Sequence, residues 1–127
     1  MMQDAAVPAW VADVFAAVDA SDARRFAAAF TDDGQFRCGN APPVIGRAAV
    51  EAAVAGFFAS IHSCRHRVLR FWEGSGSCAM DGLVTYTRLD GRELTLPFAN
   101  VFVLRERRIA EYLIFVDVAP LFAGGAA

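Results

Sequence analysis

Hydrophobic residues recur at three- and four-residue spacing along the first half of the chain. Between residues 7 and 18 they fall on one stripe of a helix, which comprises Val7, Trp10, Val11, Val14, Phe15 and Val18. Ser21 or Asp22 can cap a second, short helix that carries Phe26 and Phe30. The helical period returns after Gly46 at Val50, Val54, Phe57, Phe58 and Ile61. The pattern therefore predicts three helices.

The segment between the second and third helices breaks this pattern. Asp33-Gly34 predicts a turn, residues 36–38 can form a short strand, and Pro42-Pro43 indicates an irregular loop. From His62 onward the period changes to two, which predicts strands over residues 62–73, 77–89, 93–106 and 108–118. Helices followed by an antiparallel meander indicate an α+β fold, with the helices on one face of the sheet.

The strand around Asn100 is apolar on both of its faces. Leu94, Leu96, Phe98 and Phe102 alternate with Pro97, Ala99, Val101 and Val103. Because the helices can cover only one face, we expect a homodimer through the outer face of the sheet. Burial of that face under the helix of Trp10 or under the C-terminal tail is the alternative. A hydrophobic content of 56% with eleven Phe fits either arrangement.

Length and charge narrow the class of protein. A chain of 127 residues suits a single domain spanning residues 1–127. A formal net charge of -2 gives no basic field for nucleic acid. No signal-peptide pattern or membrane-spanning apolar run is present, so we expect a cytoplasmic protein. Three cysteines without a C-x-x-C pair do not indicate a disulfide framework or a zinc knuckle. Because all twelve basic residues are Arg, no side-chain amine can form a Schiff base.

Asn100 is the first candidate for a functional side chain. Strand alternation turns it to the same side as Phe98, so its amide lies among apolar neighbours. An unpaired amide there is costly and must bind a side chain, a water molecule or a ligand. A core amide satisfied by a neighbouring hydroxyl is the alternative to a ligand-binding role. Tyr112 on the last strand points the same way and can offer its hydroxyl.

His66 and Asp117 are candidates for proton transfer. The segment "HSCRH" places His62, Cys64 and His66 on one face of an extended strand, a donor set that suits zinc. No second ligand cluster or nearby carboxylate in the sequence completes it, so we expect no metal and interpret His66 as a pocket histidine and general base. A histidine hydrogen-bonded at the sheet edge is the alternative. Asp117 ends the last strand, either as an acid or base at the pocket floor or as a cap for the turn before Pro120.

Two further side chains complete the expected pocket. Trp72 continues the face of His66 and is expected in the pocket wall. Cys38 is either a nucleophile, if a histidine approaches it, or a small hydrophobic residue. Thr85 and Thr87 alternate with Tyr86, so Tyr86 lies on the outer face if the threonines face the pocket.

Three stretches resemble the nuclear transport factor 2-like superfamily, which includes ketosteroid isomerase, limonene epoxide hydrolase and the SnoaL-like polyketide cyclases. They are "FAAAFTDDGQFRC", "VIGRAAVEAAVAGFF" and "LPFANVFVLRERRIAEYLIFVDVAPLF". The resemblance implies a cystatin-like cone, in which three N-terminal helices pack on a strongly curved, mostly antiparallel sheet. It also implies an apolar internal pocket and usually a dimer.

The catalytic sets of the family are not preserved. The isomerase's general base falls at Cys38, its oxyanion tyrosine at Val14 and its protonated aspartate at Asn100. The epoxide hydrolase's charged residues fall at Phe98, Asn100 and Ile114. We therefore expect Cys38, Val14 and Phe98 to contact a substrate rather than to catalyse.

Together these observations predict a pocket for a small hydrophobic or aromatic molecule, without a cofactor. An isomerase, cyclase or hydratase would use His66 or Asp117 as base and Asn100 to stabilise an oxyanion. A non-catalytic ligand-binding or dimerisation module with the same fold is the alternative. A cone filled by its own Phe side chains is a third interpretation.

Overall fold

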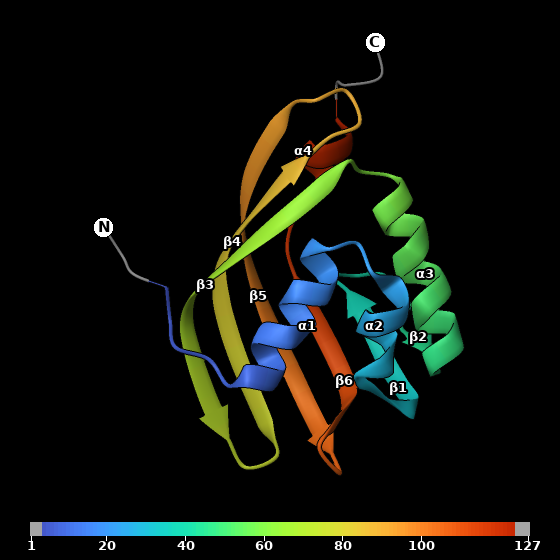
Figure 1. The fold of residues 1–127 in the computed structure, drawn as a ribbon, viewed down its shortest axis with the longest axis vertical. Coiled ribbons are helices and arrows are strands. Elements are labelled where there is room, and N and C mark those ends of the chain that lie inside the picture. Colours follow the sequence, from blue (N-terminus) through green and yellow to red (C-terminus); the bar gives the residue numbers. More distant parts are fainter. Residues whose placement is uncertain (1–3, 124–127) are drawn as a thin grey trace.

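A computed structural model describes residues 4–123 (Figure 1). The helices are α1 (Ala9–Asp19), α2 (Ala23–Ala28), α3 (Arg47–Ala59) and α4 (Ala119–Phe122). The strands are β1 (Phe30–Cys38), β2 (Val44–Ile45), β3 (Ser63–Gly74), β4 (Ser77–Thr87), β5 (Glu93–Arg105) and β6 (Arg108–Phe115). The expected α+β class is confirmed, and β2 and α4 were not expected.

The ends of the helices follow from local chemistry. Helix α1 begins directly after Pro8, where a missing backbone N–H is tolerated. Asp22 caps α2, because its side chain accepts a hydrogen bond of 3.0 Å from the backbone N–H of Arg25. Helix α3 follows Gly46, and the Arg47 guanidinium donates to the carbonyl of Phe30 at 2.6 Å. This bond ties the start of α3 to the start of β1.

The six strands form one sheet in the order β2-β1-β6-β5-β4-β3. Strands β3 to β6 make the expected antiparallel meander, whereas β1 pairs in parallel with β6. The sheet curves strongly, and α1, α2 and α3 lie against its concave face (Figure 1). The arrangement is the cone that the sequence predicts. No helix within residues 4–123 is long and apolar enough to cross a membrane.

A bulge in β3 contributes to this curvature. The pairing register between β3 and β4 shifts between Val68 and Arg70, opposite Gly82. A Cβ atom at Gly82 would lie 1.8 Å from the carbonyl oxygen of Arg67, so only glycine allows the two strands to approach this closely. Bulges and glycines of this kind bend and twist a sheet.

The bulge also corrects the prediction for Trp72. One extra residue in β3 reverses which face the following side chains occupy. Trp72 is therefore paired with Ala79 on the outer face, where it is 53% exposed and lies under the Arg70 guanidinium. The expectation that Trp72 forms a pocket wall is wrong.

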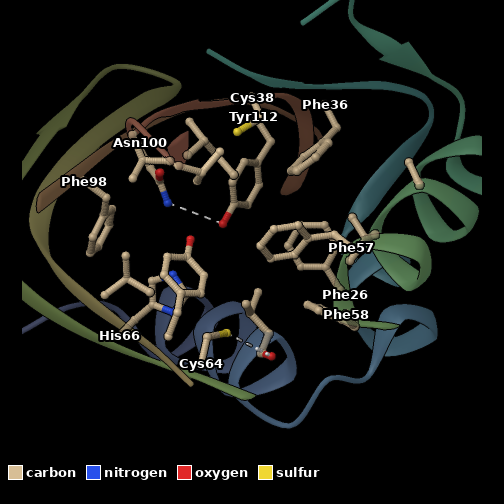
Figure 2. Close-up of a pocket in the computed structure, with 18 of the residues that line it drawn as sticks. Phe26, Phe36, Cys38, Phe57, Phe58, Cys64, His66, Phe98, Asn100 and Tyr112 are labelled. Atoms are coloured by element: carbon tan, nitrogen blue, oxygen red, sulfur yellow. Dashed lines mark hydrogen bonds between the residues drawn. The ribbon is translucent and has the colours of Figure 1, made fainter. Parts of the chain in front are cut away.

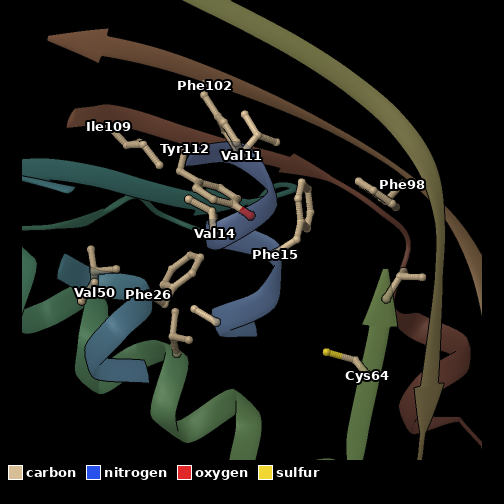
Figure 3. Close-up of a cluster of buried hydrophobic side chains, with 14 of the residues drawn as sticks. Val11, Val14, Phe15, Phe26, Val50, Cys64, Phe98, Phe102, Ile109 and Tyr112 are labelled. Carbon is tan, nitrogen blue, oxygen red and sulfur yellow. The ribbon is translucent and has the colours of Figure 1, made fainter. Parts of the chain in front are cut away.

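The main core lies between α1 and the sheet (Figure 3). Val11, Val14 and Phe15 of α1 point toward Phe102 and Tyr112, whose rings are 4.3 Å apart between centroids. Val14 is buried in this contact and does not line the cavity described below. The expectation that Val14 contacts a substrate is wrong, because α1 packs directly on the sheet at this level.

The two faces of the sheet differ as the alternation in β5 predicts. Asn100 is buried on the inner face, whereas Val101 faces outward. Trp10 packs on Phe102 with ring centroids 5.9 Å apart, so its helix covers the inner face. On β4, Tyr86 is buried, and the hydroxyl of Thr85 bonds that of Thr95 at 2.9 Å on the outer face. The threonines therefore do not face the pocket.

Candidate active site

A cavity of about 220 Å³ lies between the concave face of the sheet and the helices (Figure 2). Its lining is largely aromatic and includes Phe26, Phe36, Phe57, Phe58 and Phe98. The nitrogen- and oxygen-bearing side chains in its wall are His66, Tyr86, Asn100 and Tyr112. A mostly apolar cavity with a few converging polar groups is the usual form of a small-molecule site.

Asn100 and Tyr112 form a hydrogen-bonded pair in the cavity wall. The side chain of Asn100 is only 2% exposed, and its Nδ2 donates to the Tyr112 hydroxyl at 3.4 Å. Its Oδ1 is buried without a hydrogen-bond partner among residues 4–123. Adjacent strands hold the pair, because Asn100 is on β5 and Tyr112 is on β6, where it stacks on Phe30. An unpartnered buried oxygen costs free energy, which a donor on a ligand would recover.

Burial also determines the protonation of Tyr112. Desolvation raises its pKa far above the ordinary value of 10.0, since the phenolate would be surrounded by apolar side chains. The hydroxyl therefore stays protonated at neutral pH. It can donate a hydrogen bond to an oxygen that becomes negative during a reaction.

His66 forms a second polar unit with Asp19, the last residue of α1. The Nδ1 atom of His66 lies 2.7 Å from Oδ1 of Asp19. Oδ2 of the same carboxylate accepts the backbone N–H of His66 at 3.1 Å. An Nδ1–H that donates to this carboxylate leaves the Nε2 lone pair of a neutral imidazole free. The imidazole is held between Phe15 and Phe98, with ring centroids 5.0 Å and 5.2 Å away.

The two polar units face each other across the cavity. Figure 2 shows Asn100 and Tyr112 on one side, with His66 and Cys64 on the opposite side. Phe26, Phe57 and Phe58 lie toward the helices. A bound molecule would thus meet a basic nitrogen on one side and hydrogen-bonding groups on the other.

Asp19 and Tyr86 are the polar residues of the site that sequence reasoning missed. Asp19 had one signal, because a carboxylate in the last turn of a helix opposes the helix dipole and needs another reason to be there. Tyr86 is buried in the cavity wall, and desolvation raises its pKa well above 10.0. It was missed because the sequence of β4 does not show which of its two alternating sets of side chains faces the cavity.

Within the part of the chain that the structure describes, Asp19, Cys64 and His66 form the cluster that could hold a metal ion. Their ligand atoms all lie within 4.8 Å of one another, and zinc accepts this donor set. Asp19 is the nearby carboxylate that the sequence did not reveal. However, burial, together with the charge of Asp19, raises the pKa of the Cys64 thiol to about 12, and both carboxylate oxygens already bond His66. The geometry is that of a hydrogen-bonded pair with a neutral thiol beside it. His62 is exposed and not part of the cluster.

The cavity also contains Cys38 and Phe98, as the sequence predicts. Cys38 is half-buried, and desolvation raises the pKa of its thiol. A thiol that resists ionisation is a weak nucleophile, so Cys38 acts as a small apolar surface.

Asp117 lies outside the cavity, which corrects the expectation of a catalytic carboxylate at its floor. Strand β6 ends at Phe115, and Asp117 is exposed. Its Oδ1 accepts the backbone N–H of Ala119 at 3.0 Å and so caps the turn before Pro120. Val116, in phase with Tyr112 and Ile114, lines the cavity together with Val118, so Asp117 between them points away from it.

Comparison with solved structures finds the same fold. An NTF2-like protein of unknown function from Burkholderia pseudomallei has a TM-score of 0.79 at 20% identity, with 87% of this chain and 90% of that chain covered. A protein with a ketosteroid isomerase-like fold from Catenulispora acidiphila, in complex with trimethylamine, has a TM-score of 0.84 at 14% identity over 93% and 92%. An LEH-like epoxide hydrolase from M. tuberculosis has a TM-score of 0.74 at 14% identity over 88% and 83%.

At these identities the similarity shows the fold and not the activity. A comparison with curated proteins finds no significant match. The model of the SnoaL-like domain matches residues 11–112, which is most of the chain. The chain has the fold of the NTF2-like structures, as its sequence resemblance implies, and it belongs to the SnoaL-like domain family.

Proposed function

We propose that this protein is a cofactor-independent enzyme that transfers a proton on a small, largely apolar carbonyl compound. The reaction class is isomerisation, cyclisation or hydration. The observation that carries the proposal is the Asp19–His66 pair, which faces the Asn100–Tyr112 pair across an apolar cavity.

The chemistry follows from the two pairs. Nε2 of His66 removes a proton from the carbon next to the substrate carbonyl, and the C–H electron pair forms a C=C bond as the carbonyl π pair moves onto oxygen. Asp19 stabilises the imidazolium that forms. Tyr112 or Asn100 donates a hydrogen bond to the enolate oxygen. In an isomerisation the imidazolium then returns the proton to a different carbon, so that no atom is gained or lost.

The surroundings support this role. An apolar, aromatic lining strengthens each electrostatic interaction with the developing charge. The M. tuberculosis neighbour is named as an epoxide hydrolase, so the fold is used for chemistry on small molecules in at least one relative. The present chain would use His66 as its base, since Cys38, Phe98 and Ile114 occupy positions where the family carries catalytic residues.

Hydrogen exchange at carbon tests the proposal without knowledge of the natural substrate. A compact ketone such as 1-indanone is incubated with the protein in D₂O, and loss of the α-proton signal is followed by NMR. We expect exchange faster than in buffer, and a fall of about a hundredfold or more in His66→Gln. His62→Gln, the same change at the exposed histidine, and Asp117→Ala should keep the wild-type rate.

Equal exchange in wild type and His66→Gln would refute the proposal. A second candidate function is a binding module that uses the same cavity without catalysis. The ionisable residues of the two family mechanisms are replaced here, which favours this alternative. It predicts that 1-indanone binds without any exchange above the buffer rate.

The proposal extends to the partners of the chain. The outer face of the sheet carries apolar side chains, including Val101, Leu113 and the 47% exposed Phe115. A second copy of the chain, docked on this face, would cover them without closing the cavity on the opposite face. We propose that the functional form of the protein is a homodimer.

A further inference from the structure

We infer that the Asn100–Tyr112 pair selects ligands that carry a hydroxyl group and a carbonyl group close together on a small ring system. This inference names the substrate class and rests on the proposed function of the same cavity. It starts from the unpartnered Oδ1 atom of Asn100, which is buried in an otherwise apolar wall.

The hydrogen-bonding capacity of the pair can be counted. The Nδ2 group of Asn100 donates to the oxygen of Tyr112. The hydroxyl hydrogen of Tyr112 is then free to donate, because a hydroxyl is both donor and acceptor. Oδ1 of Asn100 is free to accept. The second N–H of Nδ2 is free as well, so the pair offers two donors and one acceptor side by side.

The opposite orientation of the amide leads to the same count. If Tyr112 donates to Oδ1, both N–H groups of Nδ2 become free donors and the phenol oxygen becomes the free acceptor. In both arrangements a lone carbonyl on a ligand would leave the acceptor of the pair unsatisfied, and a lone hydroxyl would have to serve two donors and one acceptor with a single oxygen. Each unsatisfied buried group costs about 1–3 kcal/mol, so the cavity should discriminate against such ligands.

A hydroxyl beside a carbonyl is the ligand chemistry that satisfies both groups. The carbonyl oxygen accepts from one free donor, and the hydroxyl accepts from the other and donates to the free acceptor. The carbonyl also acidifies the neighbouring C–H that His66 would deprotonate. A lactam offers C=O and N–H too, but its nitrogen cannot accept a hydrogen bond, so its one carbonyl oxygen would have to serve both free donors.

The cavity sets the size of the ligand. An apolar cavity of roughly 150 Å³ accommodates benzene. The present cavity of about 220 Å³ therefore has room for a substituted ring or two small fused rings. Phe98 and the other rings of the lining provide flat apolar contacts for such a molecule.

A matched set of bicyclic probes tests the inference. Indane carries no oxygen, 1-indanone carries the carbonyl alone, 1-indanol carries the hydroxyl alone, and 3-hydroxy-1-indanone carries both; 2-oxindole represents the lactams. Binding is measured by isothermal titration calorimetry in His66→Gln, so that turnover cannot disturb it. We expect 3-hydroxy-1-indanone to bind about tenfold more tightly than either single-oxygen probe.

Variants of the pair provide the controls. Asn100→Leu should reduce the preference for the hydroxy ketone to roughly twofold or less, because the buried acceptor is gone. Asn40→Leu makes the same change on an exposed loop and should keep the preference. Tyr112→Phe keeps the ring and removes the hydroxyl, so it should also abolish the preference while the fold is retained.

The inference is wrong if 1-indanone, 1-indanol or 2-oxindole binds as tightly as 3-hydroxy-1-indanone. It is also wrong if Asn100→Leu and Tyr112→Phe both keep the preference. Neither result depends on exchange at carbon, which is measured in the wild-type protein. A failure of selectivity and a failure of catalysis can therefore be told apart.

Discussion

Asp19 shows how a single residue can oppose local stability and serve the site. It occupies the last position of α1, where the negative end of the helix dipole disfavours a carboxylate. No residue of α1's last turn is basic. The two bonds from Asp19 to His66 compensate, and they fix both the position of the ring and the nitrogen that carries the proton. Asp19 is thus a positioning residue for the proposed base.

Replacing Asp19 by Asn tests whether this carboxylate positions His66, because the substitution keeps the size of the side chain and changes its hydrogen bonding. An amide can present its N–H to Nδ1, which moves the imidazole proton to Nε2 and removes the basic lone pair from the cavity. We expect carbon exchange of 1-indanone to fall by about a hundredfold or more. Nitrogen NMR of His66 should show a change of tautomer, which a purely structural role would not produce.

The matched control is Asp13→Asn, because Asp13 is an exposed residue of the same helix. It should leave both the exchange rate and the tautomer of His66 unchanged. If Asp19→Asn also exchanges protons at the wild-type rate, Asp19 has no part in orienting the base.

Cys64 links the site to the pH dependence of stability. Its ordinary pKa is 9.0, and burial beside Asp19 raises the pKa in the folded protein to about 12. Between these values the unfolded chain loses the thiol proton while the folded chain keeps it. Stability therefore falls as the pH rises from about 9 to about 12, by up to about 1.4 kcal/mol per pH unit from this group. Below pH 9 the thiol is neutral in both states and has no such effect.

Cys64→Ala should reduce this loss of stability at alkaline pH. The free energy of urea unfolding is measured at pH 8 and pH 10.5 in the wild type and in the variant. The difference between the two pH values should be smaller in Cys64→Ala, whatever the variant's stability at pH 8. Cys38→Ala, which removes a less buried thiol, should change the difference less. If the free energy of unfolding changes equally between pH 8 and pH 10.5 in wild type and Cys64→Ala, the Cys64 thiol is not the source of the pH dependence.

At the level of the elements, sequence patterns predicted most of the fold. The apolar periods of α1, α3 and the four long strands are local properties, so they were readable from the chain. The parallel pairing of β1 with β6 was not, because it joins segments far apart in sequence. The bulge in β3 was also missed, and it alone accounts for the error at Trp72.

The candidate site was predictable only in part, for the same reason. Asn100 and Tyr112 followed from alternation along β5 and β6. The contact between Asp19 and His66 joins residues 47 positions apart, and no local pattern indicates it. Asp117 is out of phase with Tyr112, so alternation already placed it off the inner face, and only a bulge near the end of β6 could have turned it toward the cavity.

Two glycines test the explanation of the sheet's curvature. Gly82→Ala would place a Cβ atom 1.8 Å from a backbone oxygen of β3, so the strands must separate. We expect a loss of about 2–4 kcal/mol in the free energy of unfolding. Gly56→Ala lies in α3, where no atom is within 4 Å of the new methyl group, and should stabilise the protein by about 0.5–1 kcal/mol. Urea unfolding measures both, and a neutral Gly82→Ala would show that β4 does not need glycine there.

At the scale of the whole molecule, the two faces of the sheet differ in what lies against them. Residues of the inner face and of helices α1, α2, α3 and α4 line the cavity. The outer face combines apolar residues of β4, β5 and β6 with charged residues of β3. One of these, Arg70, forms an ion pair with Asp81 of β4. An apolar centre beside charged groups is the pattern of a protein interface.

Val101→Arg tests the proposed dimer, because Val101 faces outward on β5. A charge there would be desolvated at the two-fold contact without a partner, so association should be lost. Light scattering coupled to size exclusion should give a dimer for the wild type and a monomer for Val101→Arg. Ala12→Arg, on the exposed side of α1, should remain dimeric. Carbon exchange of 1-indanone should persist in the monomer, since every cavity residue comes from one chain. A monomeric wild type would refute the proposed dimer.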